Sequence, residues 1–319
     1  MDGNYEKNAA LLADAVARHA FLFPVKNHRL ADGTLNVRGN LDVWNTAMEP
    51  FFKTPLWEKT PGWDARGALQ REPYFVFVPA PRPDAHKPVV LVAHGGGFAW
   101  RSGCEGANAA WYFHNAGYPT AILAYRLKPY PRMAAVADMQ RAIRLLRAGK
   151  DAFGTDGRVV AAGFSAGAMT AGNCATHFDA GAPDAPDAAD RCSSRPDACV
   201  MCYGAFSAVS FPAPFGVDPD PDGMFGATPV ERLYLAPEKN VTADTPPFFV
   251  WQTLSDDARH GLCLAKALAD AQVPFELHVF EGGAHGLALA DGENDLAADI
   301  PHIAHWARLC TEWLEMHGL

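Results

Sequence analysis

The pattern of hydrophobic and polar positions changes near residue 74. From there, short and continuously apolar runs alternate with longer segments whose apolar residues recur at helical spacing. The runs predict strands over 74–80, 89–94, 119–125, 158–164, 198–204, 248–253 and 275–281. The segments between them predict helices over 105–116, 133–150, 166–178, 262–271 and 300–318. This alternation is typical of an α/β fold with a mostly parallel sheet and helices on both faces.

Three segments do not follow this alternation. Residues 1–65 predict a helix near 5–20 and then an irregular stretch, and we expect them to form an N-terminal helical extension packed on a main domain of residues 66–319. Residues 179–196, rich in Ala, Asp and Pro, predict an exposed loop. The Pro- and Phe-containing region 205–240 predicts a flap or lid over a site.

Composition and charge narrow the range of partners. The chain is 49% hydrophobic and 20% charged, as expected of a globular protein. Its formal charge of -9 argues against nucleic acid and against anionic membrane surfaces. No apolar run approaches the length of a membrane span and no signal peptide is visible, so we expect a cytoplasmic protein. The seven cysteines are expected to be reduced and mostly buried.

The sequence GFSAG, residues 163–167, fits the G-x-S-x-G pattern between a predicted strand and a predicted helix. A turn this tight strains its central residue, and flanking glycines leave the hydroxyl of Ser165 accessible. The N-terminus of the following helix offers free N–H groups and a positive dipole to developing negative charge. A simple helix N-cap is the alternative interpretation of Ser165, so the motif alone does not decide.

Candidates for a base and an acid follow downstream. A serine hydroxyl is a weak nucleophile at neutral pH and needs a base that is itself oriented by a carboxylate. His285 comes just past the last predicted strand, and Asp256 and Asp257 come just past the strand before it. All three therefore fall at carboxyl ends of strands, in the order serine, acid, histidine.

The stretch HGGG, residues 94–97, places three consecutive glycines directly after a predicted buried strand. Attack on an ester carbonyl forms an oxyanion, which must meet preorganised N–H donors that side chains would obstruct. We predict an oxyanion hole formed by the N–H groups of Gly96, Gly97 and Ala166, with His94 shaping the loop by hydrogen bonding. A flexible turn is the alternative, but the place of the glycines after an earlier strand favours the hole.

In combination, these motifs resemble the α/β-hydrolase superfamily. Within it, the chain is similar to bacterial acetyl-xylan-esterase/feruloyl-esterase-like carboxylesterases related to hormone-sensitive lipase, from about Tyr74 to Leu319. The motifs that carry the resemblance are HGGGF, AYRL, GFSAG, DRCSSRPDACV, VTADTPPFFVWQTLSDD and VPFELHVFEGGAHGLAL. The resemblance implies Ser165 as nucleophile and His285 as base in the hydrolysis of an acyl ester, usually acetyl on a sugar.

The acid is open between two neighbours. In the family it usually precedes a proline, and Ala258 stands at that place, which favours Asp257. Counting forward from the prolines at 246–247 favours Asp256. We predict Asp257, with Asp256 as the alternative.

The expected activity is that of a serine carboxylic-ester hydrolase acting on short acyl groups, without cofactor or metal. Feruloyl or aryl esters, an N-formyl arylamine and, less readily, a peptide are the alternative substrates. Phe98, Trp100 and Phe164 are predicted to bind the substrate. The usual Gly-His and Tyr-Pro of the family are replaced at 168–169 and 203–204, which affects substrate identity. Whether the protein forms a homo-oligomer is left open.

Overall fold

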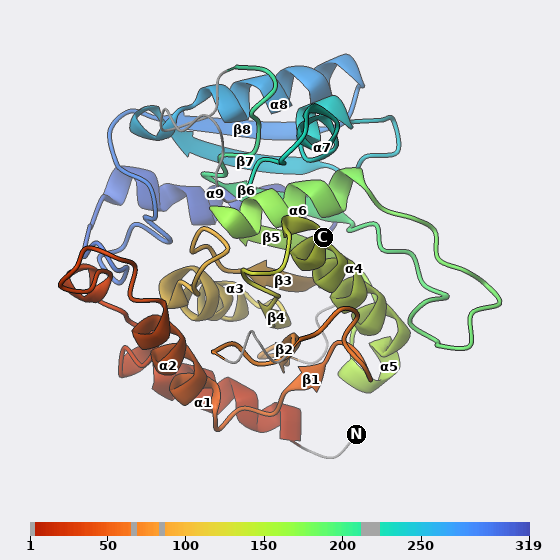
Figure 1. Cartoon of the computed structure of the whole chain (residues 1–319). Coiled ribbons are helices and arrows are strands. Elements are labelled where there is room, and N and C mark those ends of the chain that lie inside the picture. Colours follow the sequence, from red (N-terminus) through yellow and green to blue (C-terminus); the bar gives the residue numbers. More distant parts are fainter. Residues whose placement is uncertain (1–3, 65–68, 83–86, 212–223) are drawn as a thin grey trace.

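A computed structural model describes residues 4–64, 69–82, 87–211 and 224–319 (Figure 1). Its strands form one sheet in the order β1-β2-β4-β3-β5-β6-β7-β8. β2 is antiparallel to both β1 and β4, and all pairings from β4 to β8 are parallel. The predicted α/β fold is therefore confirmed. The strands are β1 (Thr54–Pro55), β2 (Tyr74–Val78), β3 (Val89–Ala93), β4 (Thr120–Ala124), β5 (Val159–Phe164), β6 (Ala198–Cys202), β7 (Phe248–Thr253) and β8 (Phe275–Phe280).

Helices cover both faces of the sheet (Figure 1). They are α1 (Asn4–Ala17), α2 (Val37–Met48), α3 (Ala109–Asn115), α4 (Arg132–Ala148), α5 (Lys150–Phe153), α6 (Ala166–Thr176), α7 (Pro229–Tyr234), α8 (Arg259–Asp270) and α9 (Pro301–Met316). Neighbouring residues of a strand point to opposite faces. On β3, Val90 and Val92 accordingly pack with residues of α1, α3 and α9, whereas Val89 and Leu91 pack with residues of α4, α6 and α8.

Several predicted boundaries differ from the structure. The helix expected over 105–116 begins as a π-helical turn, η3 (Cys104–Asn108), and continues as α3. Helix α2, inside the segment expected to be irregular, was not predicted. β8 is partly exposed because it lies at the edge of the sheet. Of the predicted flap, residues 212–223 lie outside the described residues.

The loop over 179–196 projects from the molecule (Figure 1) and is held to α4 by arginines. Arg141 pairs with Asp187 and with Asp190, and Arg144 pairs with Asp179. Among the helices of the described residues, none combines the length and the hydrophobicity needed to cross a bilayer.

Candidate active site

Ser165 occupies the tight turn between β5 and α6. Its backbone has φ 52° and ψ -117°, a strained conformation for a residue with a side chain. The turn depends on its glycines: a Cβ on Gly163 would lie 2.1 Å from the carbonyl oxygen of Gly167. A Cβ on Gly167 would lie 2.1 Å from the carbonyl oxygen of Ala93 on β3. The sequence therefore permits a turn that presents the hydroxyl of Ser165 beyond the end of the strand.

Ser165 and His285 meet although they are 120 residues apart. The Oγ of Ser165 lies 2.7 Å from Nε2 of His285, and Nδ1 of His285 lies 2.7 Å from Oδ2 of Asp256. Asp256 ends a short 3-10 turn, η6 (Leu254–Asp256), directly after β7, and its side chain is only 5% exposed. This hydrogen-bonded chain orients His285 with Nε2 toward the serine hydroxyl.

The preference for Asp257 is wrong. Asp257 adopts a left-handed conformation with φ 51°, which turns the chain away from His285. Its two carboxylate oxygens each lie 2.6 Å from a guanidinium nitrogen of Arg259. The hydrogen bonds from Arg259 lower the pKa of Asp257, so this carboxylate is ionised and paired at the surface.

The surroundings of His285 tune its basicity. Burial disfavours the charged imidazolium, but the hydrogen bond to Asp256 and the negative charges of Asp256 and Glu105 outweigh it. Together they raise the pKa of His285 above its ordinary value. An imidazole held in this way can accept the proton of Ser165 and stabilise the positive charge that it then carries.

The loop after β3 exposes backbone next to the nucleophile. Gly96 has φ +115°, and a Cβ there would lie 2.4 Å from the carbonyl oxygen of Trp100. Gly96, Gly97 and Ala166 all line the same cavity as Ser165. Within the described part of the chain, none of these three N–H groups donates to a protein acceptor. Ala166 opens α6, where N–H groups lack intrahelical partners. These groups are the candidates for the oxyanion hole.

The N-terminal segment supports this loop. Asn40 on α2 exchanges two hydrogen bonds with the backbone of Arg101, at 2.8 and 3.0 Å. The buried guanidinium of Arg101 donates to Nε2 of His94 at 2.9 Å, and His94 Nδ1–H donates to the carbonyl of Gly95 at 2.6 Å. Burial, reinforced by the charge of Arg101, lowers the pKa of His94 well below its ordinary value. His94 is therefore a neutral part of the loop scaffold, as its position suggested.

A buried carboxylate that sequence reasoning missed connects three parts of the site. Glu105, on the π-helical turn η3, accepts the Gly95 N–H at 3.0 Å and the Tyr203 hydroxyl at 2.7 Å. Tyr203, directly after β6, in turn accepts the N–H of Ala288 at 2.9 Å. Burial raises the pKa of Glu105. In the sequence, the signal for Glu105 was an acidic residue among small residues shortly after the glycines. Its partner Tyr203 is 98 residues away, so the sequence did not indicate their contact.

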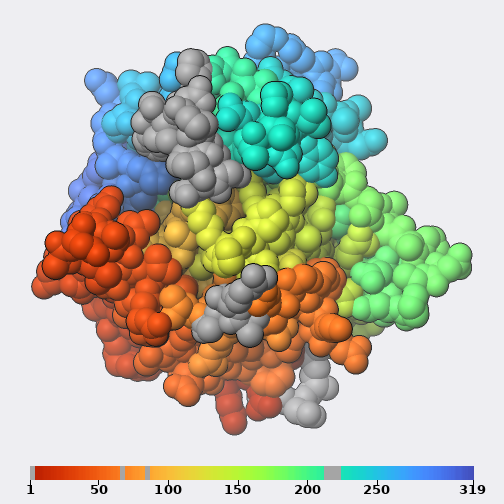
Figure 2. Space-filling model, in the orientation of Figure 1, coloured from red at the N-terminus to blue at the C-terminus, as the bar shows by residue number. Residues whose placement is uncertain are grey.

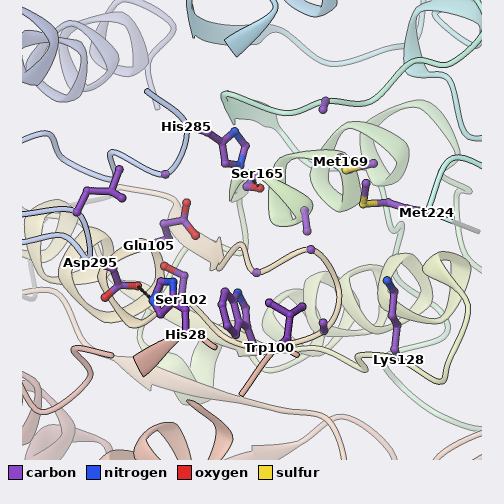
Figure 3. Close-up of a pocket in the computed structure, with 18 residues that line it drawn as sticks. His28, Trp100, Ser102, Glu105, Lys128, Ser165, Met169, Met224, His285 and Asp295 are labelled. Carbon is purple, nitrogen blue, oxygen red and sulfur yellow. Dashed lines mark hydrogen bonds and ion pairs between the residues drawn. The ribbon is translucent and has the colours of Figure 1, made fainter. Parts of the chain in front are cut away.

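A cavity of about 500 Å³ surrounds the nucleophile. In Figure 3, His28, Ser102, Glu105 and Asp295 lie on one side of Ser165, and Met169, Met224 and Lys128 lie on the other. Trp100 also lines the cavity, and its contact with substrate stays a prediction.

The predictions for Phe98 and Phe164 are contradicted, because neither lines the cavity. Phe98 is buried near Tyr125, and Phe164 is buried in the core against Tyr203 and Trp306. Phe164 is the last residue of β5, and its side chain points into the core rather than into the site.

No cluster of His, Cys, Asp and Glu side chains suited to a metal ion occurs among the described residues. The pair Cys199 and Cys202 lies within β6 with both thiols buried and unpaired in disulfides. Their arrangement is that of strand residues in the core.

The BD-FAE family model matches residues 76–260. A solved acetyl ester-xyloside bifunctional hydrolase from Caldicellulosiruptor lactoaceticus is 34% identical, with a TM-score of 0.72 over 84% of this chain and 96% of that chain. A propionate-bound esterase from Thermogutta terrifontis, 21% identical with a TM-score of 0.66, covers 84% of this chain and 94% of its own and shares the fold. Endo-1,4-beta-xylanase B of Butyrivibrio fibrisolvens is 32% identical over 66% of this chain. The matched region covers only 34% of the length of the xylanase.

Proposed function

Because the chain belongs to the BD-FAE family, we propose that it is a carboxylic ester hydrolase that removes short acyl groups, acetyl foremost, from carbohydrate. The observation that carries this proposal is the hydrogen-bonded chain Ser165–His285–Asp256, which faces a cavity lined by unpaired N–H groups. Such a site suits acyl transfer through a covalent intermediate. Similarity to an acetyl ester-xyloside hydrolase supports acetylated sugars as the substrate class.

In the first step, Ser165 Oγ attacks the ester carbonyl carbon while its proton passes to His285 Nε2. The negative charge that forms on the carbonyl oxygen is met by the N–H groups of Gly96, Gly97 and Ala166. His285 then gives the proton to the alcohol oxygen as the carbon–oxygen bond breaks, which leaves the acyl group on Ser165. Asp256 holds the imidazole in place and stabilises the imidazolium throughout.

In the second step, water takes the place of the departed alcohol. His285 Nε2 removes a proton from this water as its oxygen attacks the acyl carbon. Collapse of the second oxyanion returns the proton to Ser165 and releases the carboxylic acid. Every proton transfer and every developing charge in the two steps is accounted for by Ser165, His285 and Asp256 together with the three N–H groups.

The test is hydrolysis of p-nitrophenyl acetate, butyrate and octanoate by the wild type and by Ser165→Ala. We expect fastest turnover of the acetate and its loss in Ser165→Ala. Ser193→Ala is the matched control, because its hydroxyl bonds a loop carbonyl of Asp179 and does not line the cavity. Turnover that survives Ser165→Ala would overturn the assignment of the nucleophile. A marked preference for a feruloyl ester over acetate would move the substrate to the aryl class.

A further inference from the structure

The two ends of the cavity differ in chemistry. One end carries Met169 and Met224, and the other carries the carboxylates of Glu105 and Asp295 together with His28. Among the described residues that line the cavity, Lys128 is the only lysine or arginine, and Figure 3 places it at the methionine end. The end with Glu105 and Asp295, here called the acceptor end, is therefore rich in hydrogen-bond acceptors.

The acceptor end lies on the side of the leaving alcohol. His285 Nε2 hands its proton to the alcohol oxygen, so the alcohol must leave on the side of the imidazole. Glu105 accepts the hydroxyl of Tyr203, whose ring centroid lies 5.3 Å from that of His285, and Asp295 lies on the same side of Ser165 as Glu105 (Figure 3). The acyl group then lies toward Met169 and Met224, whose apolar side chains suit a hydrocarbon chain.

Asp295 is fixed by the N-terminal segment and still has acceptor capacity. One oxygen accepts the N–H of Phe23 at 3.3 Å. The other lies 4.0 Å from Nε2 of His28, too far for a hydrogen bond, and that nitrogen donates instead to the carbonyl of Phe23 at 2.8 Å. The side chain is 14% exposed and faces the cavity (Figure 3).

The N-terminal extension and the connection between β8 and α9 are also joined outside the cavity. His19 of the extension pairs with Glu293 of the connection at 2.8 Å. The side chain of Asn108, on η3, donates to the backbone carbonyl of the same Glu293 at 3.0 Å. Figure 2 shows the red N-terminal residues against the blue C-terminal region on this side of the molecule. Because His28 and Leu35 line the cavity, the N-terminal extension builds part of its wall.

We propose that Asp295 is a specificity-determining residue that accepts hydrogen bonds from the free hydroxyls of the sugar bearing the ester. This proposal rests on the proposed function. The indole of Trp100, whose ring centroid lies 4.6 Å from that of His28, supplies an apolar surface of the same cavity. An anionic alcohol would face two acidic side chains at this end, whereas a neutral polyol can donate hydrogen bonds to their oxygens.

The experiment compares two acetates in wild type, Asp295→Asn and Asp295→Ala. One is methyl mono-O-acetyl-xyloside, which has free hydroxyls, and the other is p-nitrophenyl acetate, which has none. The quantity measured is the ratio of kcat/KM for the xyloside to kcat/KM for the aryl acetate. Asp299→Asn is the matched control, because it makes the same change at an exposed position of the same connection, outside the cavity. Asp295→Asn keeps an acceptor for the Phe23 N–H and so preserves the fold.

We expect Asp295→Ala to lower this ratio about 10- to 100-fold at pH 8, mainly through KM, as loss of a hydrogen bond to a charged group does. The pH is set at 8 because burial raises the pKa of Asp295 to about 7. Asp295→Asn should fall between Asp295→Ala and wild type, and Asp299→Asn should leave the ratio unchanged. An unchanged ratio in both Asp295 variants would overturn the proposal. So would preferred turnover of acetylcholine that is lost in Asp295→Asn, because the site would then recognise a cation. Failure of wild type on every acetate would instead refute the proposed function.

Discussion

Removal of the charge from Asp256 and from Asp257, one at a time, tests the geometry of the site. The two residues are adjacent, and Asp→Asn keeps the size of both side chains. Asparagine also tolerates the left-handed backbone of Asp257, so neither change should disturb the turn after β7. Any difference between the variants therefore reports which carboxylate orients His285.

The magnitudes follow from the contacts. Asp256 is 5% exposed and holds His285 Nδ1 at 2.7 Å, so its amide would stabilise the wrong tautomer and no longer compensate the imidazolium. Such a change lowers kcat by about 10⁴-fold, or about 5 kcal/mol in the barrier. The carboxylate of Asp257 forms its ion pair with the exposed Arg259, and loss of this pair should change kcat by less than about threefold.

The assay is kcat for p-nitrophenyl acetate at pH 7.5, with thermal melting to confirm that both variants fold. A ratio of kcat values between Asp257→Asn and Asp256→Asn of about 10³ or more is expected. If Asp257→Asn were the inactive variant, the placement of Asp256 against His285 would be refuted. Equal activities would show that neither carboxylate orients the base.

Three further predictions concern pH, the loop and stability. The acid limb of kcat/KM should lie above pH 6.5, because raising the pKa of His285 keeps it protonated to higher pH, and Glu105→Gln should move that limb down. Gly96→Ala should lower kcat about 100-fold with the fold intact by circular dichroism, because the added Cβ meets Trp100 and displaces an oxyanion donor. Burial first, then the charge of Glu105, raises the pKa of Asp295 from 3.8 to about 7. Its ionisation therefore costs stability progressively as pH rises from 4 to 7. Asp295→Asn should accordingly raise the unfolding free energy by roughly 2–4 kcal/mol at pH 8 and by little at pH 4, measured by urea denaturation.

The hydrophobic pattern of the chain was sufficient to predict the fold, and short motifs such as HGGGF and GFSAG were sufficient to indicate the family. Continuously apolar strands such as 89–93 and 159–164 must be buried on both faces, and only helices on both sides of a parallel sheet achieve this. The glycines at 96, 163 and 167 likewise carried local information, because each marks a place where backbone must approach closely. The sequence also singled out Ser165 and His285, which the structure brings together.

Tertiary structure decided which side chains meet. Asp256 and Asp257 differ by one position, and only the left-handed backbone at Asp257 sends one inward and the other to Arg259. Contacts such as Tyr203 with Glu105 and Phe23 with Asp295 join residues 98 and 272 positions apart. Sequence patterns report local burial and local backbone freedom, whereas these contacts arise from the packing of distant segments. The role of the N-terminal extension at the cavity was for that reason visible only in three dimensions.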